Sequence, residues 1–136
     1  MGNRGSRASD RDEQATAAPL AAAGVLDEHR AEAESVLLAA TAGEPLCRIT
    51  EGGDPTEPKY AEGALAAITE LQRAVRSTPD GDELTLARSL LASWEVQQHA
   101  CAGWGVAWSA YRNGGVAELR SLVTKLAALG AAPLDR

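Results

Sequence analysis

Histidine is the side chain best suited to acid or base catalysis near neutral pH, and this chain has two. His29 falls at the edge of a helical face that carries Leu26 and Ala33, so its imidazole is expected to lean inward. It is therefore the candidate catalytic acid or base. His99 follows Glu95 by four residues, a spacing that lets a carboxylate orient an imidazole. Because His99 points away from the aromatic stripe described below, we interpret this pair as a surface ion pair.

No other pattern in the chain indicates a metal, a cofactor or a nucleophile. Cys47 and Cys101 lack metal-ligand spacing, and the Glu-x-x-His signature of di-iron bundles is missing. The sequence contains no glycine-rich phosphate loop and no serine nucleophile elbow. We therefore expect no metal site and no cofactor, and the residues favour a protein that is not an enzyme.

A second chemical signal is the concentration of aromatic residues in one segment. All three tryptophans and one of the two tyrosines lie between Trp94 and Tyr111, and phenylalanine is absent. Aromatic rings bring the largest buried area per residue and dominate cores, pockets and interfaces. A spacing of three and four residues places them on one helical stripe with a glutamine and a cysteine. The predicted ligand or interface residues are Trp94, Gln97, Cys101, Trp104, Trp108 and Tyr111.

This stripe has three interpretations, which the sequence leaves open. The rings can fill the core, form the seam between two copies of the chain, or line a pocket for a small molecule. Gln97 is the unusual member, because a buried amide needs hydrogen-bond partners. We expect Gln97 to lie among the rings, with the indole N–H groups as donors.

Helices must position these residues, because the hydrophobic pattern has the helical period and strand signals are absent. Helices are predicted over about 15–42, 60–77, 82–112 and 116–130. Thr78-Pro79-Asp80-Gly81 predicts a turn, with Asp82 capping the third helix, and Asn113-Gly114-Gly115 predicts a chain reversal. Residues 43–59 are expected to form a long loop. The fold class is therefore all-α, an antiparallel bundle of about four helices with a long third helix.

Composition places these helices in one domain with a thin core. Residues 1–14 are polar and lack periodicity, which predicts a disordered tail, and 15–136 form a single helical-bundle domain. Hydrophobic residues make up 45% of the chain, but many of them are alanines. The core of one copy is therefore expected to be completed by a second copy or by a ligand.

Charge and hydropathy exclude several partners. The net charge of −6 and the lack of a basic stripe argue against nucleic acid. No segment approaches the ~20 apolar residues that cross a bilayer, and no export signal precedes the domain, so we expect a cytoplasmic protein. Arginine far outnumbers lysine and alanine is abundant, which favours an actinobacterial source.

Two functions from different classes follow. The first is a non-catalytic helical bundle that binds a protein partner, most simply a second copy, or an apolar or aromatic small molecule through the Trp-rich helix. The alternative is a small cofactor-independent enzyme of bacterial specialised metabolism, with His29 as acid or base beside an aromatic pocket. A further formal match, of residues 1–6 to the N-myristoylation pattern, would matter only inside a eukaryotic host.

Overall fold

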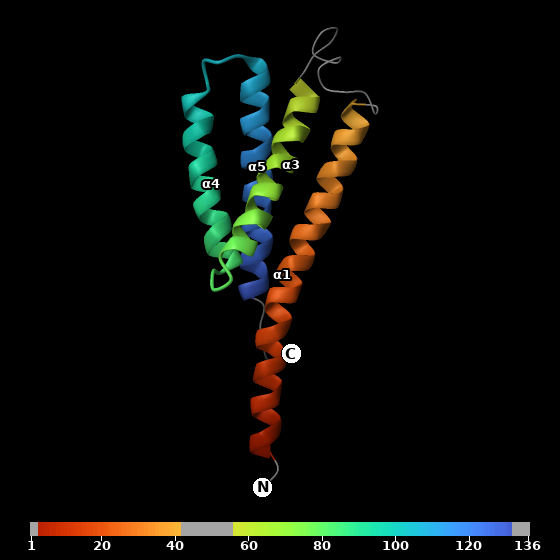
Figure 1. The fold of residues 1–136 in the computed structure, drawn as a ribbon, viewed down its shortest axis with the longest axis vertical. Helices are drawn as coiled ribbons and strands as arrows, with labels where there is room; N and C mark the ends of the chain where they lie inside the picture. The colour runs from red at the N-terminus through yellow and green to blue at the C-terminus, as the bar shows by residue number, and fades with distance from the viewer. Residues whose placement is uncertain (1–2, 42–55, 132–136) are drawn as a thin grey trace.

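The computed structural model describes residues 3–41 and 56–131, with side chains over 21–41 and 56–130. The elements in this part of the chain are α1 (Asn3–Thr41), α3 (Thr56–Ser77), α4 (Glu83–Ala100) and α5 (Val106–Ala131). Figure 1 shows α1 and α4 running toward one end of the molecule, and α3 and α5 running back. The predicted all-α bundle of four helices is therefore confirmed.

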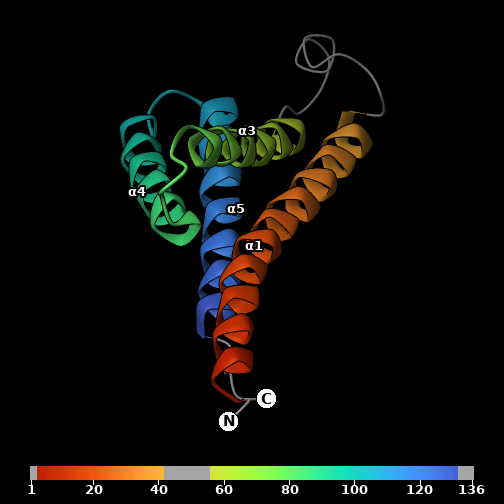
Figure 2. The same ribbon diagram turned by 60° about the horizontal axis from the view of Figure 1, so that its bottom comes forward.

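The closest helix pair is α3 and α5, whose backbones touch where the two helices cross. In Figure 2, α3 lies across the upper part of α5. A β-carbon at Gly63 would fall on the carbonyl oxygen of Tyr111, and one at Gly114 would fall on the carbonyl oxygen of Tyr60. The crossing is nearly symmetrical, with one glycine from each helix facing a backbone carbonyl of the other. Only glycine permits so close an approach, because it has no β-carbon.

The core lies between α3, α4 and α5 and extends to one face of α1. Its largest fully buried side chains are Ile68, Leu71, Val116, Leu119 and Leu122, from α3 and α5. The apolar residues of these two helices follow the three- and four-residue spacing that the sequence indicated. This pair of helices is therefore the frame on which α4 and α1 pack.

Helix α1 packs on this frame through a narrow apolar stripe. Its buried residues Ala22, Leu26, His29 and Ala33 keep helical spacing, and Leu26 is the one large apolar side chain among them. The first half of α1 extends beyond the other helices (Figure 1). The contact of α1 with the frame is therefore short and rich in alanine.

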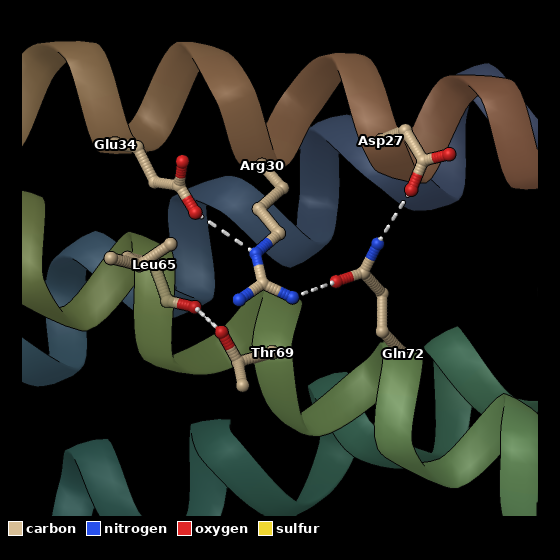
Figure 3. A network of polar contacts seen from close by, with 6 residues as sticks. All are labelled: Asp27, Arg30, Glu34, Leu65, Thr69 and Gln72. Carbon is tan, nitrogen blue, oxygen red and sulfur yellow. Dashed lines mark hydrogen bonds and ion pairs between the residues drawn. The ribbon is translucent and has the colours of Figure 1, made fainter.

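A polar network borders that stripe on the α3 side (Figure 3). Arg30 Nη1 donates to Gln72 Oε1 at 2.9 Å, and Gln72 Nε2 donates to Asp27 Oδ1 at 3.1 Å. Arg30 Nε also donates to Glu34 Oε1 at 3.0 Å. The Gln72 amide thus links a cation and an anion of α1, and it fixes the register of α1 against α3.

The turn between α3 and α4 matches its prediction. Gly81 N donates to the carbonyl oxygen of Thr78 at 2.9 Å, and the Asp82 carboxylate accepts from Thr85 N at 3.0 Å. Asp82 has an extended backbone and is the N-cap of α4. Local side-chain chemistry was sufficient to predict this element boundary.

The predicted long third helix is wrong. Helix α4 ends at Ala100 after 18 residues, and α5 begins at Val106 after a turn in which Gly105 adopts φ 110°. Trp104 N donates to the carbonyl oxygen of Cys101 at 3.0 Å within this turn. Glycine accepts a positive φ without steric cost, so the chain reverses here. The reversal predicted at 113–115 is also wrong, because these residues lie inside α5.

Two other boundaries differ from the expected ones, and the structure also settles the continuity of the first helix at Gly24, which the sequence left open. Helix α1 starts at Asn3 and passes through Gly24 without a break, and α3 starts at Thr56 and not at Tyr60. Most of the predicted 43–59 loop lies outside the described residues, as does Gly2 of the N-terminal motif. The division into a tail at 1–14 and a domain at 15–136 stays a prediction.

Candidate functional site

The four aromatic rings of the predicted stripe form one continuous cluster, although the helix that should have carried them is broken. The Trp94 and Tyr111 rings stack with centroids 5.6 Å apart. The Tyr111 ring meets the Trp108 ring edge-on at 6.1 Å, and Trp108 meets Trp104 edge-on at 6.3 Å. The hairpin of α4 and α5 brings these rings together, with Trp94 on one helix and Trp108 and Tyr111 on the other. The four rings therefore meet across two helices, and not along the single helical stripe that the sequence predicted.

Trp94 lies at the buried end of this cluster. It is 2% exposed, and its ring lies on Gly115, where a β-carbon would overlap it. Its indole Nε1 donates to Glu70 Oε2 at 3.0 Å, and the Arg112 guanidinium lies 4.6 Å from the ring centroid. A buried ring with a satisfied donor and a stacked cation serves packing. Trp94 is therefore a core residue that joins α3, α4 and α5.

Trp104 and Trp108 form the exposed end. They are 64% and 50% exposed, and Val106 between them is 66% exposed. We call these three residues the aromatic tip, since they lie at the turn between α4 and α5. The sequence from Ala100 to Tyr111 contains no charged side chain. Large apolar residues gathered without charge on a surface mark an interaction site more often than isolated ones do.

A pocket of about 280 Å³ lies beside the aromatic tip, between the first turns of α3 and α5. Its lining residues are Lys59, Glu62, Ala107, Trp108 and Tyr111. Burial raises the pKa of the Tyr111 hydroxyl above its usual value, while the Arg112 guanidinium opposes this rise. The rings of Trp108 and Tyr111 are the apolar part of the pocket lining, and the ion pair of Lys59 and Glu62 is its charged part. Lys59 and Glu62 had no signal in the sequence, because they precede the aromatic segment by more than 30 residues.

The two remaining members of the stripe differ from each other. Cys101 is buried with a free thiol at the end of α4. Gln97 is exposed, so its expected place among the rings is wrong. The predicted stripe assumed one unbroken helix. In the structure, the buried residues of α4 are Ala87 and Trp94.

His29 lies inward as expected, but it meets α5 far from the rings. It is 9% exposed, with Nδ1 2.5 Å from Glu118 Oε1 and Nε2 2.7 Å from Lys125 Nζ. The Lys125 ammonium can only donate, so Nε2 accepts from it and Nδ1–H donates to the Glu118 carboxylate. A second pocket, of about 400 Å³, lies here and is lined by Glu28, His29, Glu32, Glu118, Ser121 and Lys125. The two pockets share no described lining residue.

The predicted surface ion pair of Glu95 with His99 is not formed, because Glu95 pairs with a residue of α5 instead. His99 is exposed, and the Glu95 carboxylate lies 3.7 Å from the Arg120 guanidinium of α5. Among the residues that the structure describes, no cluster of three or more histidine, cysteine, aspartate or glutamate side chains has a geometry that would hold a metal ion.

Comparison of the chain with protein-family models, with curated proteins and with solved structures gave no match. None of the helices in the described part of the chain combines the length and the apolar character that crossing a membrane requires. The function must therefore be argued from the site alone.

Proposed function

We propose that this protein is a non-catalytic binding protein that pairs with a second copy of itself through the aromatic tip. The observation that carries the proposal is the exposure of Trp104 and Trp108 at 64% and 50%, side by side at 6.3 Å. Tryptophan is enriched among the few residues that supply most of the binding energy of protein interfaces. Two half-exposed indoles in contact are the strongest feature of this kind on the described surface.

The area of the aromatic tip supports a second copy as the occupant. An aromatic side chain buries about 150–250 Å² when it is covered, so the two exposed indoles offer on the order of 250 Å². Val106 and the exposed small residues around the turn enlarge this patch. A symmetrical pair doubles the area of the indoles to about 500 Å², and Val106 with its neighbours must supply the rest of the roughly 1,000 Å² that a specific interface requires.

Charge also supports self-association. The chain carries a net charge of −6, so two copies repel each other over most of their surface. The stretch from Ala100 to Tyr111 is free of charged side chains and avoids this repulsion. The aromatic tip is therefore the surface on which identical copies can meet at the lowest electrostatic cost.

Sedimentation equilibrium of the full chain over a range of concentrations tests the proposal. We expect a dimer whose dissociation constant rises by about 30-fold or more in the Trp104→Ala variant, as for an interface hot spot of ~2 kcal/mol. Leu129→Ala is the matched control, because Leu129 is an exposed apolar residue near the opposite end of α5. A monomer at all concentrations, or an unchanged dissociation constant in Trp104→Ala, contradicts the proposal.

The enzyme alternative draws support from one observation, the chain of contacts from Glu118 through His29 to Lys125. A carboxylate that orients an imidazole is a common arrangement for a catalytic base. Here, however, Lys125 occupies the second ring nitrogen, and the aromatic pocket belongs to a different part of the molecule. These two features favour His29 as a polar contact between α1 and α5, and thus the non-catalytic proposal.

A further inference from the structure

The pocket beside the aromatic tip points to a ligand class, and it shares Trp108 with the surface proposed for self-association. We infer that this pocket binds a small organic monocation with an aromatic body, an arylalkylamine. Its ammonium group would meet the Glu62 carboxylate, and its ring would lie against Trp108 and Tyr111.

The Glu62 carboxylate is the first reason for a cationic ligand. Its Oε2 atom is buried and accepts no hydrogen bond from any described residue. The Lys59 ammonium lies 3.0 Å from it, as an ion pair without hydrogen-bond geometry. This oxygen therefore has an ion-pair partner but no hydrogen bond, and it can still accept N–H donors. A ligand ammonium would bring three N–H donors and a positive charge to this atom.

The aromatic walls are the second reason. The planes of the Trp108 and Tyr111 rings meet at 78°, so the rings form a corner of the pocket. Ring faces attract cations, and edge-to-face contacts hold a further ring. The same cluster already holds a cation in this way, because the Arg112 guanidinium lies 5.3 Å from the Tyr111 ring centroid.

The size of the pocket restricts the ligand. A volume of about 280 Å³ is at the lower end for pockets that bind small molecules. It suits one aromatic ring with a short amine chain. The net charge of −6 raises the local concentration of cations around the protein.

Lys59 makes the inference sharply testable, because it competes for the same carboxylate. The Lys59–Glu62 ion pair is partly exposed, with side chains 29% and 33% accessible, so its loss costs little. Removing the Lys59 ammonium should therefore strengthen the binding of an amine. The opposite result is expected if the pocket takes an anion, since Lys59 would then be the group that binds it.

The experiment is a titration of the full chain, followed by the NMR signals of the indole N–H groups. The probes are 2-phenylethylamine, phenylacetate and 2-phenylethanol, which are similar in size and differ in charge. We expect the amine to bind about tenfold more tightly than the other two probes. Glu62→Gln should weaken amine binding by about tenfold, and Lys59→Gln should strengthen it severalfold. Glu57→Gln, which removes an exposed acid from the same turn of α3, is the matched control.

Equal affinities for the three probes, no binding of the amine, or weaker amine binding in Lys59→Gln would each overturn the inference. The titration is repeated in the Trp104→Ala variant, because Trp104 does not line the pocket. Binding of the amine in that variant separates the pocket from self-association, so either proposal can fail without the other.

Discussion

Gly63 and Gly114 set the distance between α3 and α5, because each faces a backbone carbonyl of the other helix. Glycine in a helix is unfavourable by itself, by roughly 1 kcal/mol relative to alanine. The close crossing offsets that cost by bringing the two backbones into contact. Gly115 acts in the same way toward the Trp94 ring. These glycines are therefore part of the packing that holds the aromatic cluster.

A Gly63→Ala variant tests this role. The new methyl group would overlap the Tyr111 carbonyl oxygen, so the helices must separate and the free energy of unfolding should fall by about 1–3 kcal/mol. Gly24→Ala is the control, because no atom lies within 4 Å of its added β-carbon. That variant should be neutral or more stable by up to about 1 kcal/mol. Urea denaturation of both variants measures the difference, and equal effects would contradict the close-contact role.

The sequence could not assign these glycines to packing. Gly114 and Gly115 form the pair that favours a turn, whereas Gly103 and Gly105 resemble isolated glycines within a helical stripe. Glycine is common both in turns and at close contacts between helices, because it has no β-carbon. Only the position of the neighbouring helix shows which of the two roles a given glycine has. Gln97 lies in α4 with Trp94, and its exposure places it outside the buried face of that helix. The clustering of the rings was still predictable, because four rings in so short a segment must lie close together in a helical hairpin.

At the scale of the helices, the turn between α4 and α5 creates the aromatic tip. Gly105 has a φ of 110°, a backbone angle that residues with a β-carbon rarely adopt. Its carbonyl oxygen accepts a hydrogen bond from Ser109 N at 3.1 Å, where α5 begins. The turn between α3 and α4 was predictable because Pro79, Gly81 and Asp82 act locally. The turn at Gly105 carries no comparable local signal, so its position required the tertiary structure.

Substituting Gly105 by alanine isolates the conformational contribution of this turn. Open space surrounds the position, so the expected loss of about 1–2 kcal/mol in unfolding free energy arises from the positive φ alone. Gly103→Ala is the matched control, since Gly103 also has open space but no positive φ. Thermal unfolding monitored by circular dichroism compares the two variants. A similar loss in both would show that the backbone at Gly105 is not the determinant.

At the scale of the whole molecule, α1 is attached less firmly than the other helices are to one another. Over 21–41, where its side chains are described, the apolar contact of α1 depends on Leu26, Val25 and alanines, and polar groups border it on both sides. Regions with few buried apolar contacts open locally at lower free energy than the core does. Helices α3, α4 and α5 should therefore stay folded after α1 opens when the protein is destabilised.

Leu26→Ala tests this difference in stability. Truncating a buried leucine costs about 2–5 kcal/mol, and we expect most of that loss to appear as opening of α1. Hydrogen exchange followed by mass spectrometry should show faster exchange over 21–41, with little change in α5. Leu38→Ala, at an exposed position of the same helix, is the control. Uniformly faster exchange in all four helices would mean that α1 and the frame unfold as one unit.

The burial of Cys101 affects which of the described side chains an oxidant attacks first. Thiol oxidation depends on exposure, and the Cys101 thiol is buried beneath the turn, whereas the indoles of Trp104 and Trp108 face solvent. An oxidising species therefore reaches the indoles before it reaches this sulfur. Oxidised indoles are more polar, so such damage would alter the surface proposed for self-association, while Trp94 is shielded in the core and preserves the fold.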